Sequence, residues 1–154
     1  MIILVIHGPN LNRTGYREKN VYGENTLQQI NNDILAFSNN HNIETEIFQS
    51  NSEGSIIDKI EEAENKTDFL IINPGAYTHY SYGIRDAILA SNIPTIEVHM
   101  SNIYNREKFR HKSVIAPVCK GQISGFGKIS YLLAIEACLL NFWMFLDCNT
   151  ESGI

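Results

Sequence analysis

Apolar residues along the chain form short continuous runs that are separated by polar stretches. The runs at 2–6 and 68–73 are rich in β-branched residues, which is typical of strands buried on both faces. Polar and apolar residues alternate over 43–49, and another short apolar run occupies 95–99. With a fifth strand expected near 114–118, the pattern predicts five strands.

Between the predicted strands, apolar residues recur every three or four positions, which is the spacing of helices with one buried face. Thr26 and Ser52 stand just before two of these stretches. They predict N-caps, because a side-chain oxygen there accepts a hydrogen bond from a free backbone N–H. The helices are predicted over 26–41, 52–63, 81–91 and 128–147, with a single helical turn at 105–109.

Strand and helix alternate along the whole sequence, and this alternation predicts the fold class. It favours an α/β protein, a three-layer sandwich with a five-stranded parallel sheet between two layers of helices. A chain of 154 residues fits a single domain over 1–154, in which 148–154 form a loose polar tail. Ligands of such folds bind beyond the carboxyl ends of the strands, so any chemistry is expected there.

The formal net charge is −5, from 12 Lys and Arg residues and 17 Asp and Glu residues. An acidic balance argues against non-specific binding of nucleic acid, which needs cationic side chains to displace counterions. The charge is uneven, because 44–68 holds eight acids and two bases, whereas 104–128 holds six bases and one acid. The acidic segment is interpreted as a solvated face. The basic segment is either another solvated face or a place that holds an anion.

The sequence offers no sign of a membrane span or of an oxidising environment. No apolar stretch reaches the roughly 18 residues that a span needs. The apolar N-terminus lacks the basic start of a signal peptide and ends too soon at Pro9. Cys119, Cys138 and Cys148 are odd in number and have no metal-ligand spacing, which is typical of reduced thiols. A cytoplasmic location and no membrane contact are therefore expected.

Three of the predicted strands end in polar residues. The first ends in 7–10, the third in 73–75 and the fourth in 97–102, and these ends carry Asn, His, Glu and Ser. A polar group that is buried without a partner costs about 1–3 kcal/mol, so these side chains must be paired or functional. Because parallel strands end at one edge, a functional site is expected there. A lone histidine such as His7 is more often structural.

The long segment 8–25 separates the first strand from the first helix and contains Gly15 and Gly23. Segments of this length without secondary structure are typical of lids. Arg17 and Tyr22 lie within it, and a neighbouring guanidinium favours the ionised form of a phenol, which then serves as a base. The alternative is that Tyr22 packs on the surface and Arg17 is solvated.

Several well-known site motifs are missing from the sequence. The histidines and carboxylates lack the spacing of metal ligands, and neither a G-x-x-x-x-G-K-[ST] nor a G-x-G-x-x-G loop follows the first strand. No Ser-His-Asp order with a nucleophile elbow is present. No aspartate ends the first strand, as a phosphate-accepting domain would require. We therefore expect neither a metal nor a cofactor.

Short motifs along nearly the whole chain carry a resemblance to one family. They are GPNLN at 8–12, FQSN at 48–51, NPGAYTH at 73–79, IRDA at 84–87, EVH at 97–99 and GQI at 121–123. Arg17, Tyr22, Ser101 and Arg110 match between and after these motifs. Over about 2–140 the sequence resembles type II 3-dehydroquinate dehydratase.

The resemblance implies a flavodoxin-like fold and a homo-oligomer, a dodecamer built as a tetramer of trimers. The implied reaction is the reversible dehydration of 3-dehydroquinate to 3-dehydroshikimate, a step in the biosynthesis of aromatic amino acids. Enzymes of this type remove water in the anti sense through an enolate, with neither a metal nor a Schiff base.

The resemblance also implies a role for individual side chains. Tyr22 corresponds to the general base that removes the C2 proton, and Arg17 keeps that phenol ionised. Asn10 holds a water molecule against the enolate oxygen. His99 is the general acid for the departing C1 hydroxyl, and Glu97 orients it.

Further positions correspond to substrate contacts. Met100 and Ser101 are implied to hold the substrate carboxylate through their backbone N–H groups, with help from the Ser101 hydroxyl. Asp86 resembles a residue that reaches the site of a neighbouring subunit. The implied side-chain contacts with the substrate come from Asn73, His79 and Arg110.

The sequence departs from the family pattern within the expected lid. Arg13 and Thr14 stand where apolar residues are usual, and Lys19 stands where a proline is common. Two other functions remain open. One is a non-catalytic flavodoxin-like module that binds a nucleotide or a partner, and the other is a lyase for a different cyclic polyol acid.

Overall fold

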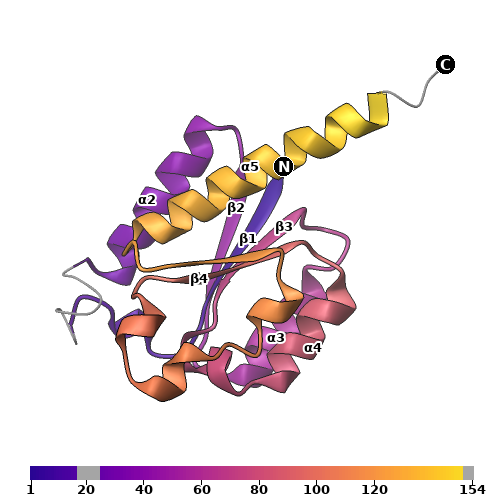
Figure 1. Ribbon diagram of the computed structural model, residues 1–154. Coiled ribbons are helices and arrows are strands. Elements are labelled where there is room, and N and C mark those ends of the chain that lie inside the picture. The colour runs from indigo at the N-terminus through magenta and orange to yellow at the C-terminus, as the bar shows by residue number, and fades with distance from the viewer. Residues whose placement is uncertain (17–24, 151–154) are drawn as a thin grey trace.

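Five parallel strands form the central sheet (Figure 1). The structure is a computed structural model that describes residues 1–16 and 25–150, with side chains to residue 140. The strands pair in the order β2-β1-β3-β4-β5, which confirms the predicted α/β fold. They are β1 (Ile2–His7), β2 (Glu44–Gln49), β3 (Phe69–Asn73), β4 (Thr95–His99) and β5 (Gly121–Ser124).

Two helices cover each face of the sheet, so the protein has the three predicted layers. In Figure 1, α2 and α5 lie on one side of the strands, and α3 and α4 lie on the other. Their bounds are α2 (Leu27–Asn40), α3 (Glu53–Glu62), α4 (Tyr82–Ser91) and α5 (Ile129–Thr150). Short 3-10 helices in the connections are η1 (Leu11–Arg13), η2 (Gly75–His79), η3 (Ile103–Asn105), η4 (Lys108–His111) and η5 (Ala116–Val118).

Side-chain caps set the beginnings of three helices. The Thr26 hydroxyl accepts a hydrogen bond from the Gln29 N–H, and the Gln29 side chain accepts one from the Thr26 N–H, which makes a capping box before α2. Ser52 and Ser81 cap α3 and α4 in the same way, by accepting the N–H of the third residue on. The predicted starts at 26, 52 and 81 are therefore confirmed.

The apolar strands supply both layers of the core. Ile3 and Val5 of β1 pack toward α2 and α5, whereas Leu4 and Ile6 pack toward α3 and α4, and all four are fully buried. Successive side chains of a strand point to opposite faces of the sheet. A sheet covered on both faces therefore requires the continuous apolar run seen in the sequence.

The prediction of a fifth strand near 114–118 is wrong, because β5 is Gly121–Ser124. Val114 and Ile115 are buried beside α4, and Pro117 lies in η5, where its missing N–H is tolerated. The apolar run at 114–118 thus packs into the core rather than into the sheet. β5 carries little apolar signal, and among the described strands it pairs only with β4.

Two other predicted boundaries change. The single helical turn expected at 105–109 is replaced by the two short helices η3 and η4. α5 continues beyond its predicted end at Asp147 to Thr150, and its last turns project away from the sheet in Figure 1, while 151–154 lie outside the described residues. In the part of the chain that the structure describes, every helix is too short or too polar to span a membrane.

The acidic segment 44–68 lies on β2, α3 and the turn that follows α3. Its carboxylates are exposed, except for that of Glu53, which is half-buried. This confirms the interpretation of a solvated face.

His7 is fully buried, at the end of β1 and on the side of α2 and α5. Its ring nitrogens are hydrogen-bonded to Tyr131 Oη and Asn31 Oδ1, both at 2.9 Å. Burial lowers the pKa of His7 from 6.5 to about 4, against the opposing effect of the Asn31 bond. The expectation of a structural histidine is consistent with this environment.

This burial predicts an acid-sensitive stability. Between pH 6.5 and about 4 the unfolded chain binds a proton at position 7 that the folded chain does not, so stability falls as the pH falls through this range. The loss from pH 7 to pH 5 should be about 2 kcal/mol, measured by urea unfolding at one protein concentration. His7→Gln should remove this part of the slope, while His41→Gln, at an exposed position, should keep it. An unchanged slope in His7→Gln would contradict the prediction.

Candidate active site

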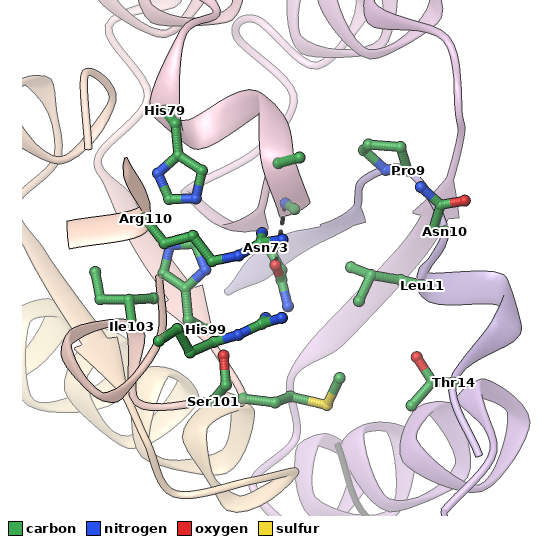
Figure 2. A pocket seen from close by; sticks show the side chains of 14 residues that line it. Pro9, Asn10, Leu11, Thr14, Asn73, His79, His99, Ser101, Ile103 and Arg110 are labelled. Atoms are coloured by element: carbon green, nitrogen blue, oxygen red, sulfur yellow. Dashed lines mark hydrogen bonds between the residues drawn. The ribbon is translucent and has the colours of Figure 1, made fainter. Parts of the chain in front are cut away.

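A pocket lies at the carboxyl ends of β1, β3 and β4 (Figure 2). The strand order reverses between β1 and β3, and ligands of parallel sheets bind at such a switch point. The cavity measures about 190 Å³, which suits a small molecule rather than a macromolecule. Its lining comprises Pro9, Asn10, Leu11, Thr14, Asn73, Gly75, Ala76, His79, His99, Met100, Ser101, Ile103, Arg106 and Arg110.

Two glycines allow the ends of β1 and β3 to pack closely. The Gly8 N–H donates to the Asn73 carbonyl at 2.8 Å, and a Cβ on Gly8 would lie 2.5 Å from the Pro74 carbonyl oxygen. Gly75 has a φ of +59°, and a Cβ there would lie 3.1 Å from the Pro9 carbonyl oxygen. Larger residues would separate the two loops that line the pocket.

The labelled side chains in Figure 2 lie on two sides of the cavity with Asn73 between them. The side opposite η1 carries the groups suited to acid–base chemistry and to anion binding. That side holds His79, His99, Ser101, Ile103 and Arg110, and the η1 side holds Pro9, Asn10, Leu11 and Thr14.

His99 is held by a fully buried carboxylate. Its Nε2 lies 2.5 Å from Oε1 of Glu97, and the His99 side chain is 8% exposed. Three further donors reach the same carboxylate: the Thr78 hydroxyl at 2.5 Å, the Ser113 hydroxyl at 2.8 Å and the Gln122 amide at 2.9 Å. Each oxygen of the buried carboxylate is therefore hydrogen-bonded.

These donors keep Glu97 ionised. Burial raises the pKa of this carboxyl group, but the hydrogen bond with His99 and those from Thr78 and Ser113 outweigh it, so the pKa lies below its ordinary value. The carboxylate fixes the orientation of the imidazole ring. With Nε2 turned toward Glu97, Nδ1 is the nitrogen of His99 that remains for a ligand.

His79 offers a different chemistry. Burial lowers its pKa, the nearby His99 and Arg110 add to this shift, and the bond to the Lys112 carbonyl opposes it. A carbonyl oxygen can only accept, so Nδ1 of His79 donates to it across 2.8 Å. The neutral ring therefore presents Nε2 as an acceptor, which suits a ligand hydroxyl.

Arg106 and Arg110 bring positive charge to the pocket. Nε of Arg110 donates to the Glu107 carboxylate at 2.9 Å, and its guanidinium carbon lies 4.7 Å from the centre of the Phe109 ring. These contacts orient a side chain that matches a carboxylate in charge and shape. Both charged side chains that line the pocket are thus cationic, although the net charge of the chain is negative.

The structure brings together most of the side chains that the sequence singled out. The residues that line the pocket are Asn10, Asn73, His79, His99, Met100, Ser101 and Arg110. Glu97 lies behind His99 and touches the pocket only through it. Asp86 is exposed on α4 and does not line this pocket. Arg17 and Tyr22 lie outside the described residues.

The sequence reasoning assigned no role to several residues of the pocket, among them Arg106 and Thr14. Arg106 belongs to the basic segment 104–128, and that charge run was the signal for it. Thr14 is 2% exposed and lines the cavity, so one departure from the family pattern lies in the site itself. Lys19, a further departure in the expected lid, lies outside the described residues.

Among the described side chains, no group of three or more His, Cys, Asp or Glu residues is placed to hold a metal ion.

The fold and the pocket define an enzyme of the parallel α/β class, with a histidine–carboxylate pair and cationic side chains at the carboxyl edge of the sheet. The chain belongs to a known family of this class, since residues 1–139 match the family model described as "Dehydroquinase class II". This confirms the resemblance drawn from the motifs.

Individual relatives agree with the family model. The 3-dehydroquinate dehydratase of Dictyoglomus turgidum is 61% identical over 140 residues, which cover 91% of this chain and 97% of that protein. The 3-dehydroquinate dehydratase of Bacillus cereus (strain AH187) is 56% identical over 137 residues, or 89% and 94% of the two chains. The crystal structure of the type II dehydroquinase of Butyrivibrio crossotus matches with a TM-score of 0.88 and 56% identity, and covers 90% of this chain and 97% of that one.

Proposed function

We propose that this pocket catalyses the reversible anti elimination of water from 3-dehydroquinate to give 3-dehydroshikimate through an enolate, in the shikimate pathway. The observation that carries the proposal is the pairing of His99 with the buried, ionised Glu97 beside two arginines. An elimination next to a ketone needs a base, a group that stabilises the enolate, and an acid for the leaving hydroxyl.

His99 supplies the acid. Its ring is turned by Glu97 so that Nδ1 is left for the leaving C1 oxygen, and the carboxylate stabilises the protonated ring that donates to it. Proton transfer then leaves a neutral imidazole that is still held by the same bond. Thr78, Ser113 and Gln122 keep Glu97 in place during this change.

Tyr22 is the base for the C2 proton, and Arg17 keeps its phenol ionised. A phenol with an ordinary pKa near 10 is about 0.1% ionised at neutral pH. Ionising it there costs roughly 4 kcal/mol of free energy, and a neighbouring guanidinium offsets part of this cost. Asn10, at the edge of the pocket next to η1, holds a water molecule against the enolate oxygen. The segment that carries Arg17 and Tyr22 serves as a lid that excludes bulk water.

The remaining polar groups bind the substrate. Arg110 and the backbone N–H groups of Met100 and Ser101 hold the carboxylate, with the Ser101 hydroxyl. The bare Nε2 of His79 accepts a substrate hydroxyl, and Asn73 bonds another polar group of the ring.

The whole enzyme is proposed to be a cytoplasmic dodecamer of four trimers without metal or cofactor. Asp86 is exposed on α4, outside the pocket of its own chain, which is compatible with a contact to the site of a neighbouring subunit. Cys119 and Cys138, whose side chains the structure describes, are free thiols.

A direct assay tests the proposal. Incubation of the purified protein with 3-dehydroquinate should raise the ultraviolet absorbance, because the product contains a conjugated enone. Quinate should give no signal, since without the ketone its C2 proton cannot be removed to an enolate. Absence of product from 3-dehydroquinate at micromolar enzyme would overturn the proposed function.

A further inference from the structure

A chain of polar groups runs from the pocket into the helix layer through the buried His7 and ends at Asn31. Asn73, Tyr131, His7 and Asn31 come from β3, α5, β1 and α2, and they are joined by hydrogen bonds of 2.9 to 3.0 Å. Tyr131 is 1% exposed and Asn73 is 3% exposed. Only Asn73 lines the pocket, so the other three residues have no place in the mechanism described above.

A backbone group sets the direction of the first bond. The Gly75 N–H can only donate, and it lies 3.2 Å from Oδ1 of Asn73 (dashed in Figure 2), so the carbonyl side of the Asn73 amide faces Gly75. The NH2 group of Asn73 therefore faces Tyr131 and donates to its hydroxyl oxygen across 3.0 Å. This assignment does not depend on any choice of side-chain protonation.

The other bonds follow from the first. The Tyr131 hydroxyl accepts from Asn73, so its one proton is free to donate to Nδ1 of His7. Nδ1 is then the unprotonated nitrogen of a neutral ring, and Nε2 carries the proton that goes to Asn31 Oδ1. Each of the three bonds then has one donor and one acceptor, and a flip of the Asn73 amide would set a carbonyl against Tyr131 and an NH2 group against the Gly75 N–H.

We propose that Tyr131, supported by His7, is a positioning residue that holds the Asn73 amide in the one orientation that binds the substrate. An amide has two N–H donors and two acceptor sites, and Tyr131 and Gly75 use one of each. One donor and one acceptor site of Asn73 remain for the ligand in the pocket. The inference rests on the proposed function, because it takes Asn73 as a substrate contact.

A double-mutant cycle tests this role. Tyr131→Phe removes only the hydroxyl and should raise KM for 3-dehydroquinate about tenfold, the effect of one lost hydrogen bond, while kcat changes much less. Asn73→Ala should also raise KM. In the Asn73→Ala background, Tyr131→Phe should then have no further effect on KM, because the group that it positions is gone.

The possible results of the cycle separate the inference from the proposed function. An equal rise of KM in both backgrounds, or no rise in Tyr131→Phe alone, would overturn the inference while wild-type turnover upholds the function. A wild type without turnover would overturn the proposed function and the inference with it. If Tyr131 had a purely structural role, Tyr131→Phe would lower the melting temperature by the same amount in both backgrounds. It would also change KM by the same factor in the wild-type and Asn73→Ala backgrounds.

Variants of His7 give a second test that leaves Tyr131 in place. His7→Leu removes the acceptor of the Tyr131 proton, which can then turn toward Asn73 and compete with its NH2 group, so KM should rise about fivefold. His7→Gln offers an amide oxygen to the Tyr131 proton and should restore KM to within about twofold of the wild type. Equal KM values in His7→Leu and His7→Gln would overturn the inference. Because Tyr131 is unchanged in both variants, this test holds even when Tyr131→Phe does not fold.

Discussion

His99→Gln should lower kcat for 3-dehydroquinate by about 100- to 10,000-fold, the usual contribution of a positioned general acid. The glutamine amide can still bond to Glu97, so the buried carboxylate keeps a partner and the fold is retained. What is lost is a protonated Nδ1 that can release its proton to the departing hydroxyl. Steady-state rates of enone formation, with KM determined separately, measure the effect.

Controls separate the loss of the acid from a general disturbance. His41→Gln, at an exposed position at the end of α2, should retain the wild-type kcat. Glu97→Gln should also lower kcat, because it removes the charge that stabilises the protonated ring of His99. A His99→Gln variant with more than a tenth of the wild-type kcat would show that another group donates the proton.

Tyr22→Phe should abolish turnover while substrate binding persists. The variant lacks the phenol oxygen, and no other group assigned to this chemistry can take the C2 proton, so kcat should fall by at least about 1,000-fold. Binding should remain because the carboxylate and the hydroxyls are held elsewhere, by Arg110 and His79 among others. Titration calorimetry with 3-dehydroquinate, alongside the absorbance assay, measures both properties.

Tyr16→Phe is the matched control for this variant. Tyr16 lies in the same connection between β1 and α2 and is 74% exposed, so loss of its hydroxyl should leave both kcat and the dissociation constant unchanged. A Tyr22→Phe enzyme with near-wild-type kcat would eliminate Tyr22 as the base. Loss of binding together with turnover would instead make Tyr22 a substrate contact.

Much of the fold could be predicted because its signals are local. The caps at Thr26, Ser52 and Ser81 depend on a hydroxyl and a backbone N–H three residues away, and both are visible in the sequence. β1 and β3 are buried on both faces, so their apolar runs have no other explanation. β5 escaped prediction because it exists through pairing with β4, not through its own composition.

The site was predictable to the extent that its residues stand at strand ends. Asn10, Asn73 and His99 follow apolar runs, and the parallel topology brings those ends together. Asp86 was assigned from motif resemblance alone. It is exposed on α4 and does not line the pocket of its own chain. Arg17 and Tyr22 remain predictions.

By itself, the sequence determined the class of the fold, the family and the residues expected to react. The spacing of apolar residues, the helix caps and the short motifs are all properties of positions close together in the chain, so they can be seen without the structure. Only the tertiary structure decided how those residues are held. Glu97 stays ionised because its hydrogen bond with His99, and those from Thr78 and Ser113, which are distant in sequence, outweigh the effect of burial on its pKa. The direction of the hydrogen bonds that orient Asn73 likewise depends on groups from four different elements, and no local pattern encodes their meeting.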